Sequence, residues 1–436
     1  MNILILIFCL IELTSSISLH LPNPLQRFVY DNTTNTIILA SVNHIYSLNA
    51  SDLSILSDID LSSSLKIDHQ CLISNRSSRL KNLYYFSTSS YLFPSVHQTF
   101  NQLLLRINNS ILICSTYNRG GSCQLRSLIN LHLIENSSHR LVSSSPLYPS
   151  IGFINQQNQI LYLANTYDHQ CDPFYVIPTI SGRYLNSKED FLSLINFNSG
   201  QSALQQSTYT LRLLNIRLIK DFFLHYLYAF EYKHFSYFLT IQQADVHHTQ
   251  KTNLQTKIVR FCQTVKQPII KSYVEVPLTC GENYHYLITA KFSPDEKILF
   301  GLFRNTTLAN LTSTSHAICA YSIDDIQRGF FQAIKRCLVD GKGYRGLGFI
   351  SPDTHCISNK NLNEINEDYC PDEWESFSQY PIGGHRAIEQ HQPIVQLNDR
   401  VNFTAIEIGS NEYERIVFVG DDHGTVHTVK AFSLLL

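Results

Sequence analysis

The sequence is poor in methionine and tryptophan, with one of each in 436 residues, and it has almost no excess of either charge. Lys and Arg number 33 against 35 Asp and Glu, a balance that argues against a surface for nucleic acid or an anionic membrane. Beyond the first residues there is no run of 18 apolar residues, so the sequence predicts no transmembrane helix. It also lacks a Gly-x-Ser-x-Gly elbow, a phosphate-binding loop and Cys-x-x-Cys pairs.

Aromatic and aliphatic residues are plentiful. Hydrophobic residues make up 44% of the chain, with 24 Tyr and 25 Phe, while charged residues make up only 16%. Such a chain has enough apolar surface to fold rather than stay disordered. Because aromatic and β-branched side chains pack well on pleated sheets, the composition favours β structure.

The N-terminus predicts a signal peptide over residues 1–18. An apolar run from Met1 to Leu10 is followed by the small residues Ser16-Ile17-Ser18, which fit a cleavage site, although the run carries no Lys or Arg before it. A buried N-terminal strand is the structural alternative. We therefore expect a secreted chain, with one domain over residues 19–436.

Cysteines and glycosylation motifs agree with secretion. Without Cys9 an even number of ten cysteines remains, as expected for disulfides. Zinc ligation is excluded by their spacing. Eight Asn-x-Ser/Thr motifs predict glycosylation. They are at Asn32, Asn49, Asn75, Asn108, Asn136, Asn305, Asn310 and Asn402.

Short apolar segments between turn signals predict strands from end to end. They cover 36–41, 44–48, 103–107, 111–114, 160–163, 222–228, 237–241, 297–303, 416–419 and 425–429. One helix is predicted over 324–336, where Ile326, Phe330, Phe331 and Ile334 share a face. So many strands without a linker favour a β-propeller, although the lack of a repeat signature leaves tandem sandwiches open.

Several segments resemble the plexin type of sema domain. The strongest are 257–262, 272–280, 316–326 and 381–384, where cysteines and flanking residues follow the plexin order, together with 120–128 around Cys123. The resemblance implies an all-β, seven-bladed β-propeller with inserted loops and one short helix. It also implies that the N-terminal strand completes the last blade, which residues 402–429 resemble.

The same resemblance implies four disulfides. They are Cys114 with Cys123, Cys262 with Cys370, Cys280 with Cys319, and Cys337 with Cys356. For the remaining Cys71 and Cys171 we predict a fifth bridge, from parity alone.

Candidate catalytic residues are few. His385, Glu389 and His391 lack the spacing of a zinc helix, as does the pair at 247–248, and we interpret them as surface residues. The sequence Asp421-Asp422-His423 ends in Gly424 between two strands, which is typical of a hairpin turn. We predict no enzyme activity, no cofactor and no metal, and a secreted propeller hydrolase is the disfavoured alternative.

Binding is the favoured function. The resemblance implies an extracellular receptor or soluble decoy for a semaphorin or another sema-domain protein, and a secreted semaphorin-like ligand, which would form a homodimer, is the alternative. Residues 168–185 resemble a third-blade stretch near the ligand-facing edge of plexins. We predict that Asp172 and Arg183 contact the partner, since rim charges orient partners and a desolvated Arg can anchor them. Local capping of loops is the structural alternative for Arg183.

Overall fold

The computed structural model describes most of the strand-forming sequence. The described residues are 3–4, 19–61, 98–116, 121–137, 141–143, 148–166, 178–185, 191–193, 210–213, 222–244, 254–263, 269–305, 315–359, 365–371, 381–398, 401–410 and 415–431. Within them β-sheets dominate and helices are few, as the composition predicted.

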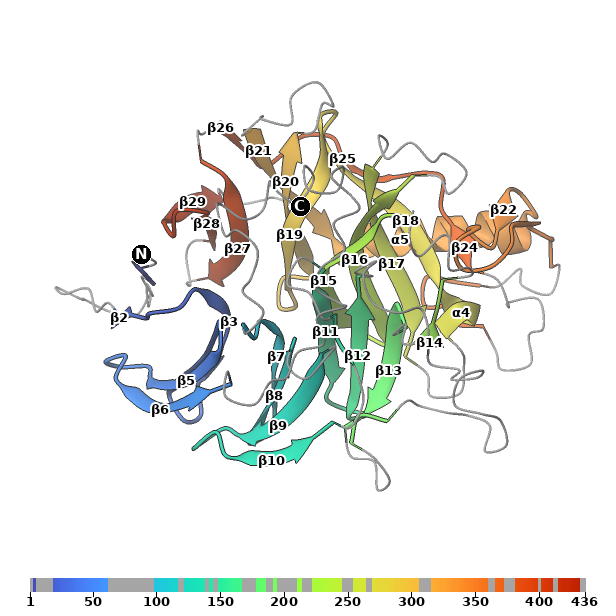
Figure 1. The fold of residues 1–436 in the computed structure, drawn as a ribbon. Coiled ribbons are helices and arrows are strands. Elements are labelled where there is room, and N and C mark those ends of the chain that lie inside the picture. Colours follow the sequence, from blue (N-terminus) through green and yellow to red (C-terminus); the bar gives the residue numbers. More distant parts are fainter. Residues whose placement is uncertain are drawn as a thin grey trace, which may run out of the picture.

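The sheets form units of three or four antiparallel strands in chain order (Figure 1). The first unit comprises β3 (Leu25–Asp31), β4 (Thr36–Ser41), β5 (His44–Asn49) and β6 (Ile55–Asp60). The second comprises β7 (Asn101–Ile107), β8 (Ser110–Ser115), β9 (Ser122–Ser127) and β10 (Leu133–Asn136). The third comprises β11 (Ser150–Asn155), β12 (Ile160–Asn165), β13 (Ile180–Tyr184) and β14 (Thr210–Leu211).

The next two units are joined into one sheet through the pairing of Cys280 with Tyr284. The fourth comprises β15 (Leu224–Tyr232), β16 (Phe235–Gln243), β17 (Leu254–Cys262) and β18 (Val274–Cys280). The fifth comprises β19 (Tyr284–Ser293), β20 (Ile298–Asn305), β21 (Ser315–Ser322) and β26 (Val395–Asn398). The sixth comprises β27 (Phe403–Ser410), β28 (Arg415–Asp421) and β29 (Val426–Ala431).

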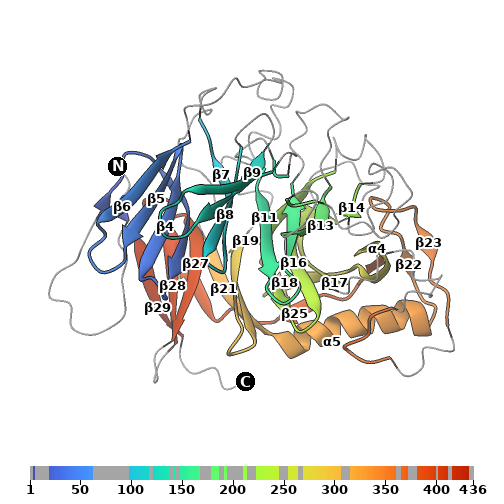
Figure 2. The ribbon, with the colours of Figure 1, turned by 90° about the horizontal axis from the view of Figure 1, so that it is seen from below.

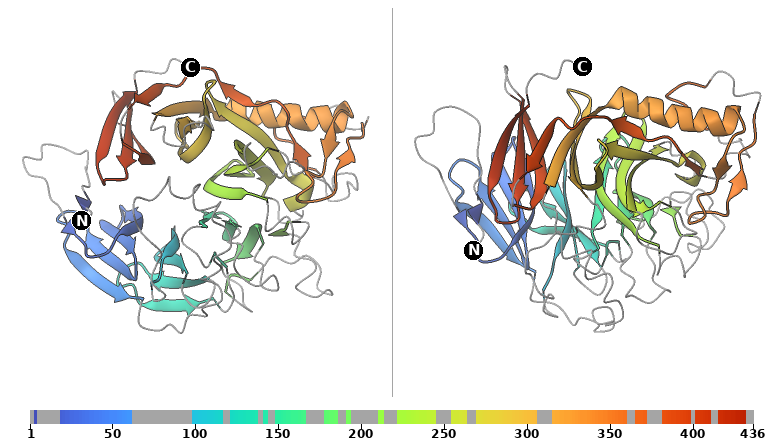
Figure 3. Two further views of the ribbon diagram at one scale, coloured as in Figure 1. Left: turned by 45° about the horizontal axis from the view of Figure 1, so that its top comes forward. Right: turned by 90° about the horizontal axis from the view of Figure 1, so that it is seen from above.

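The units are arranged around a centre like the blades of a propeller (Figure 3). The first strands of successive units contact one another, in the order β3, β7, β11, β15, β19 and β27. The fourth strands, such as β6 and β10, lie at the outer edge (Figure 1). A propeller-like all-β architecture is therefore confirmed.

Burial on both faces of the units explains the continuous apolar strands. All six residues of β4 are buried, because Ile38 and Ala40 pack against the second unit while Ile37 and Leu39 lie on the opposite face. Similar apolar clusters fill the interfaces between later units. A radial arrangement of sheets is what allows a strand to bury both faces in this way.

An insertion separates the third and fourth strands of the fifth unit. This insertion, residues 323–394, begins with α5 (Ile323–Ile334) and the π-helix η4 (Lys335–Val339). The described part also contains four short strands, β22 (Tyr344–Arg345), β23 (Thr354–His355), β24 (Ile382–Gly383) and β25 (Ile388–Gln390). Figures 2 and 3 show α5 on the outside of the ring. There it packs against β18.

The helix begins one residue before the predicted start. Ser322 caps it by accepting a hydrogen bond from the backbone N–H of Asp325, and Ile326, Phe330 and Ile334 are buried as predicted. The α-helix ends at Ile334, where it continues as η4. The expectation of a single helix was wrong, since α4 (Ile269–Ser272) forms a further turn next to β17, too short for a periodic pattern to reveal.

The four disulfides implied by the resemblance are confirmed. Cys114 pairs with Cys123, Cys262 with Cys370, Cys280 with Cys319, and Cys337 with Cys356. Cys262–Cys370 attaches the insertion to β17, and Cys337–Cys356 closes a loop inside the insertion. Cys71 and Cys171 lie outside the described residues, so their bridge stays a prediction.

The N-terminal strands differ from the expectation. In the described residues β1 (Ile3–Leu4) pairs with β2 (Leu19–His20), and the sheet of the sixth unit contains β27, β28 and β29. Completion of that sheet by the N-terminal strand is therefore not seen there. The described residues also hold no helix of the length and hydropathy needed to span a bilayer.

Candidate functional site

Of the two residues predicted to contact a partner, Arg183 is described and Asp172 is not. Arg183 lies in β13 with 3% of its surface exposed. Its guanidinium donates hydrogen bonds to the carbonyl oxygen of Leu192 at 3.0 Å and to Ser181 Oγ at 3.2 Å. This arrangement matches the capping alternative, and a partner contact by Arg183 stays a prediction. Asp172 lies outside the described residues.

The sequence Asp421-Asp422-His423 forms a hairpin turn between β28 and β29, as predicted. The buried Asp421 carboxylate accepts hydrogen bonds from the backbone N–H groups of His423 and Thr425 and lies 2.8 Å from His427 Nε2. Burial on its own raises the pKa of Asp421. The hydrogen bond with His427 and those from the backbone of Thr425 and His423 lower the pKa by more, so the net pKa lies below the ordinary value. Gly424 takes a φ of 83°, which glycine adopts without strain. The carboxylate thus holds a turn in place.

The other histidines considered for chemistry lie on the surface or outside the described residues. His385, Glu389 and His391 are exposed, and His391 Nδ1 lies 3.9 Å from Glu389 Oε2. Residues 247–248 are not described. Within the described part of the chain, no three His, Cys, Asp or Glu side chains lie close enough together to hold a metal ion.

Exposed apolar side chains occur on the outer strands of the first two units, which are two separate sheets. On β6, Ile55 and Leu56 are 50% and 55% exposed. On the turn before β10 and on β10 itself, Ile129, Leu133 and Ile134 are 73%, 44% and 49% exposed. We call these five residues the outer-edge patch. Exposed apolar residues on an edge strand, whose backbone groups are open to pairing, are typical of a protein-binding surface.

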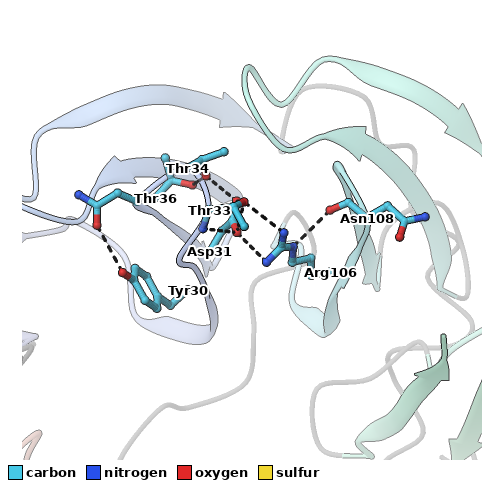
Figure 4. A network of polar contacts seen from close by, with 8 residues as sticks. Tyr30, Asp31, Thr33, Thr34, Thr36, Arg106 and Asn108 are labelled. Carbon is cyan, nitrogen blue, oxygen red and sulfur yellow. Dashed lines mark hydrogen bonds and ion pairs between the residues drawn. The ribbon is translucent and has the colours of Figure 1, made fainter.

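A charged contact fixes the neighbouring tips of the same two units (Figure 4). Arg106 Nη1 lies 2.6 Å from Asp31 Oδ1, and its Nε donates to the carbonyl oxygen of Asn108. The fully buried Asp31 also accepts hydrogen bonds from the hydroxyls of Thr33 and Thr34. The turn after β3 is therefore held to the turn after β7.

The pKa of Asp31 follows from these contacts. Burial on its own raises the pKa of Asp31, but the hydrogen bonds from Thr34 and Thr33 and the positive charge of Arg106 outweigh it. The net pKa lies below the ordinary value of the carboxyl group. Asp31 is therefore ionised at neutral pH and serves the structure rather than proton transfer.

A second buried charge belongs to the fourth unit. Lys257 Nζ lies 2.5 Å from Glu275 Oε1, and the Nε2 amide of Gln242 donates to both oxygens of the same carboxylate. Tyr273 donates its hydroxyl hydrogen to Glu275 Oε2 at 3.3 Å. Each oxygen of the buried Glu275 carboxylate thus accepts hydrogen bonds. These contacts link β16, β17 and β18.

The comparisons with known proteins identify the architecture. Residues 283–433, which cover the fifth unit, the insertion and the sixth unit, match the family described as the Sema domain. The chain resembles a sema domain. The full extracellular region of plexin A4 superimposes with a TM-score of 0.73 at 23% identity, covering 93% of this chain and 45% of that one. Drosophila semaphorin 1a gives a TM-score of 0.60 at 13% identity, covering 93% of this chain and 75% of that one.

Proteins similar to this chain in sequence include plexins. Plexin-2 of Caenorhabditis briggsae is 23% identical over 357 residues, which cover 80% of this chain and 17% of that protein. Mouse Plexin-B3 is 29% identical over 212 residues, covering 47% of this chain and 10% of that protein. The chain thus spans less than a fifth of the length of these plexins. The resemblance to the plexin type is confirmed.

Sequence reasoning missed the outer-edge patch. Residues 129–133 alternate apolar and polar side chains, a pattern that predicts burial of the apolar ones, whereas only Leu131 is buried and Ile129 and Leu133 are exposed. Its one signal is the run of apolar residues beside the sequon at Asn136, a motif that requires an exposed position.

Proposed function

We propose that this sema domain is an extracellular protein-binding module whose partner is another sema domain of the semaphorin type. It would act as a receptor domain or as a soluble decoy that occupies the ligand. The observation that carries the proposal is the outer-edge patch on a plexin-like propeller. A solved structure with a TM-score of 0.53 holds Drosophila Plexin A in complex with Semaphorin 1b.

The patch has the chemistry of a protein interface. Its apolar side chains would be removed from water by a partner, at roughly 25 cal/mol per Å² of buried surface. Nearby on β5 and β6, His44 Nδ1 lies 2.9 Å from the partly exposed Asp58. Such polar groups around an apolar centre orient a partner without supplying most of the affinity.

Matched variants test the use of this edge. Ile129→Asp places a charge on the patch, and Ile357→Asp places the same charge on the insertion, at residues 73% and 75% exposed. We expect Ile129→Asp to weaken binding to a semaphorin at least tenfold, while Ile357→Asp changes it less than twofold. Equal affinities of the two variants would show that the outer-edge patch is not part of the interface. Charge reversal at Asp172 tests the other proposed contact in the same assay.

Secretion forms part of the proposal. Residues 1–18 are proposed as a cleaved signal peptide and 19–436 as the sema domain, with glycans on exposed sequons. Support comes from the disulfides, which persist in oxidising compartments. N-terminal sequencing of the released chain tests this, and a new N-terminus at residue 19 is the expected result. Light scattering of the same sample distinguishes a monomer from the homodimer that the semaphorin-like ligand alternative requires.

We also propose that the complete ring has seven blades, as the plexin resemblance implies, rather than the six described units. Two sheet faces support this proposal. Phe28 and Tyr30 are 54% and 43% exposed on the face of β3 that carries Ile37 and Leu39. On the sixth unit, Phe418 is half-buried and Val426 is 38% exposed. Electron cryomicroscopy of the secreted chain bound to an antibody fragment tests it, and a ring of six blades would refute it.

A further inference from the structure

The insertion contains a cavity of about 270 Å³ that the proposed partner binding does not use. Its walls are the second half of α5, the π-helix η4, the segment from Lys342 to Tyr344, and residues 383–386 after β24. The cysteines of the Cys337–Cys356 disulfide both line it, so a covalent link joins η4 to the segment that follows β23.

Glycines allow the walls to approach one another. A Cβ atom on Gly383 would lie 2.7 Å from Leu347 Cδ2, and one on Gly384 would lie 3.0 Å from Val276 Cγ2. The backbone N–H of Gly384 donates to the carbonyl oxygen of Glu275 at 2.7 Å, which fixes this segment against β18. Gly343, with a φ of 98°, turns the chain beside His385. The cavity is therefore built by fixed backbone.

The lining is strongly basic. Arg336, Lys342 and Arg386 carry three positive charges, against the single negative charge of Asp340 among the lining residues. All four side chains are exposed. In the described part of the chain, none of the three cations forms a salt bridge or a side-chain hydrogen bond. By contrast Arg328, two turns earlier on α5, is paired with Asp325 at 2.6 Å.

The geometry points to a site for a sulfated saccharide unit. Guanidinium groups bind the oxygens of sulfate or carboxylate through paired hydrogen bonds, and an ammonium group adds a point charge. The cavity is larger than a free inorganic anion needs and comparable with one substituted sugar ring. Tyr344, 57% exposed, adds an aromatic ring for the sugar face. We propose that the chain binds a sulfated extracellular polysaccharide through this cavity, whichever protein partner it has.

The probe is a heparin-derived hexasaccharide added to the full secreted chain captured on a surface. Saturable binding is expected, together with at least tenfold weaker binding by the double variant Arg336→Gln/Arg386→Gln. The matched control, Arg328→Gln/Lys335→Gln, removes two positive charges from the same helical segment without touching the cavity lining. It should change the affinity less than twofold.

Three results would overturn the proposal. They are no binding of the hexasaccharide, equal weakening in the two double variants, or equal binding of inorganic sulfate or a poly-glutamate peptide at matched concentration. Unfolding temperatures check that both variants fold. If the Gln variant does not fold, Arg336→Lys/Arg386→Lys is used instead. It keeps the two charges but lacks the planar guanidinium groups, and it should bind the hexasaccharide at least threefold more weakly than the wild type. Semaphorin binding is measured separately, so the two proposals can fail independently.

Discussion

The guanidinium carbon of Arg260 on β17 lies 4.1 Å from the centre of the Phe235 ring on β16. The same group lies 5.0 Å from the ring of Phe330 on α5, and its Nη1 donates to the carbonyl oxygen of Glu367 at 3.0 Å. Arg260 is therefore in contact with the propeller and with two parts of the insertion. Burial lowers the pKa of Arg260 from its ordinary high value, and the guanidinium remains protonated at neutral pH.

Replacing Arg260 by Met should loosen the insertion. The change removes two cation–π contacts and leaves the Glu367 carbonyl without its donor, which together should cost about 2–3 kcal/mol of unfolding free energy. Hydrogen exchange should rise in α5 and in residues 365–371 while β3–β6 stay protected. Unchanged protection of α5 would show that apolar packing alone holds the helix.

The contact between Asp31 and Arg106 should raise the free energy of unfolding at neutral pH, and this stabilisation should be lost in acid. Asp31→Asn should lower the free energy of unfolding by about 2–3 kcal/mol at pH 7, because a buried carboxylate with several donors is lost. The control is Asp52→Asn on the same unit, where the exposed carboxylate accepts bonds from Ser54 and the change should be below about 0.5 kcal/mol. Chemical denaturation measures both.

The sign of the acid effect follows from the lowered pKa of Asp31. Its stabilisation is present above the pKa of the unfolded chain, about 3.9, and is lost as the pH falls through the lower folded value. The wild type should thus lose stability below about pH 4 more steeply than Asp31→Asn. Parallel curves for the two proteins in that range would contradict this assignment.

His225 on β15 predicts a second pH dependence. Burial lowers its pKa to about 4, below the ordinary value of 6.5. Between these values the unfolded chain binds a proton that the folded chain does not, so stability should fall with decreasing pH by up to about 1.4 kcal/mol per unit. His225→Phe should flatten the curve between pH 6.5 and 4. If the unfolding free energy of this variant still falls with pH in that range, the pH dependence comes from other groups.

Glycan occupancy should follow exposure. Asn32 and Asn108 lie on turns beside the Asp31 and Arg106 contact, and Asn136 ends β10, and all three are exposed. Mass spectrometry of glycopeptides from the secreted chain should find these three sites modified. A glycan at Asn136 would also lie next to Ile134, so enzymatic removal of glycans should strengthen partner binding at the outer edge. Unmodified peptides at all three positions would contradict the prediction.

Much of the fold could be predicted because its causes are local. Alternating and continuous apolar runs gave β4, β5, β8 and β28 within a residue or two, and the acidic start with Ile326 and Phe330 gave α5. The disulfides came from the resemblance rather than from physical reasoning, since cysteine spacing alone does not fix pairing. Sheet pairing between the fourth and fifth units depends on long-range contacts that no short pattern encodes.

The binding features could be predicted only in part. Arg183 was chosen for its charge, but burial depends on neighbours such as Leu192 that a sequence pattern does not place around it. The basic cavity brings Arg336 together with Arg386, fifty residues along the chain, through the disulfide and the Gly383-Gly384 backbone. Such a site becomes visible only once the insertion is folded.

The central claim is that this sema-like propeller binds a semaphorin-type partner, and surface plasmon resonance tests the claim most directly. The glycosylated, disulfide-intact secreted chain would be exposed to a panel of semaphorin ectodomains. We expect saturable binding to at least one, reduced at least tenfold by Ile129→Asp and less than twofold by Ile357→Asp. Absence of binding across the whole panel by the correctly folded chain would contradict the account.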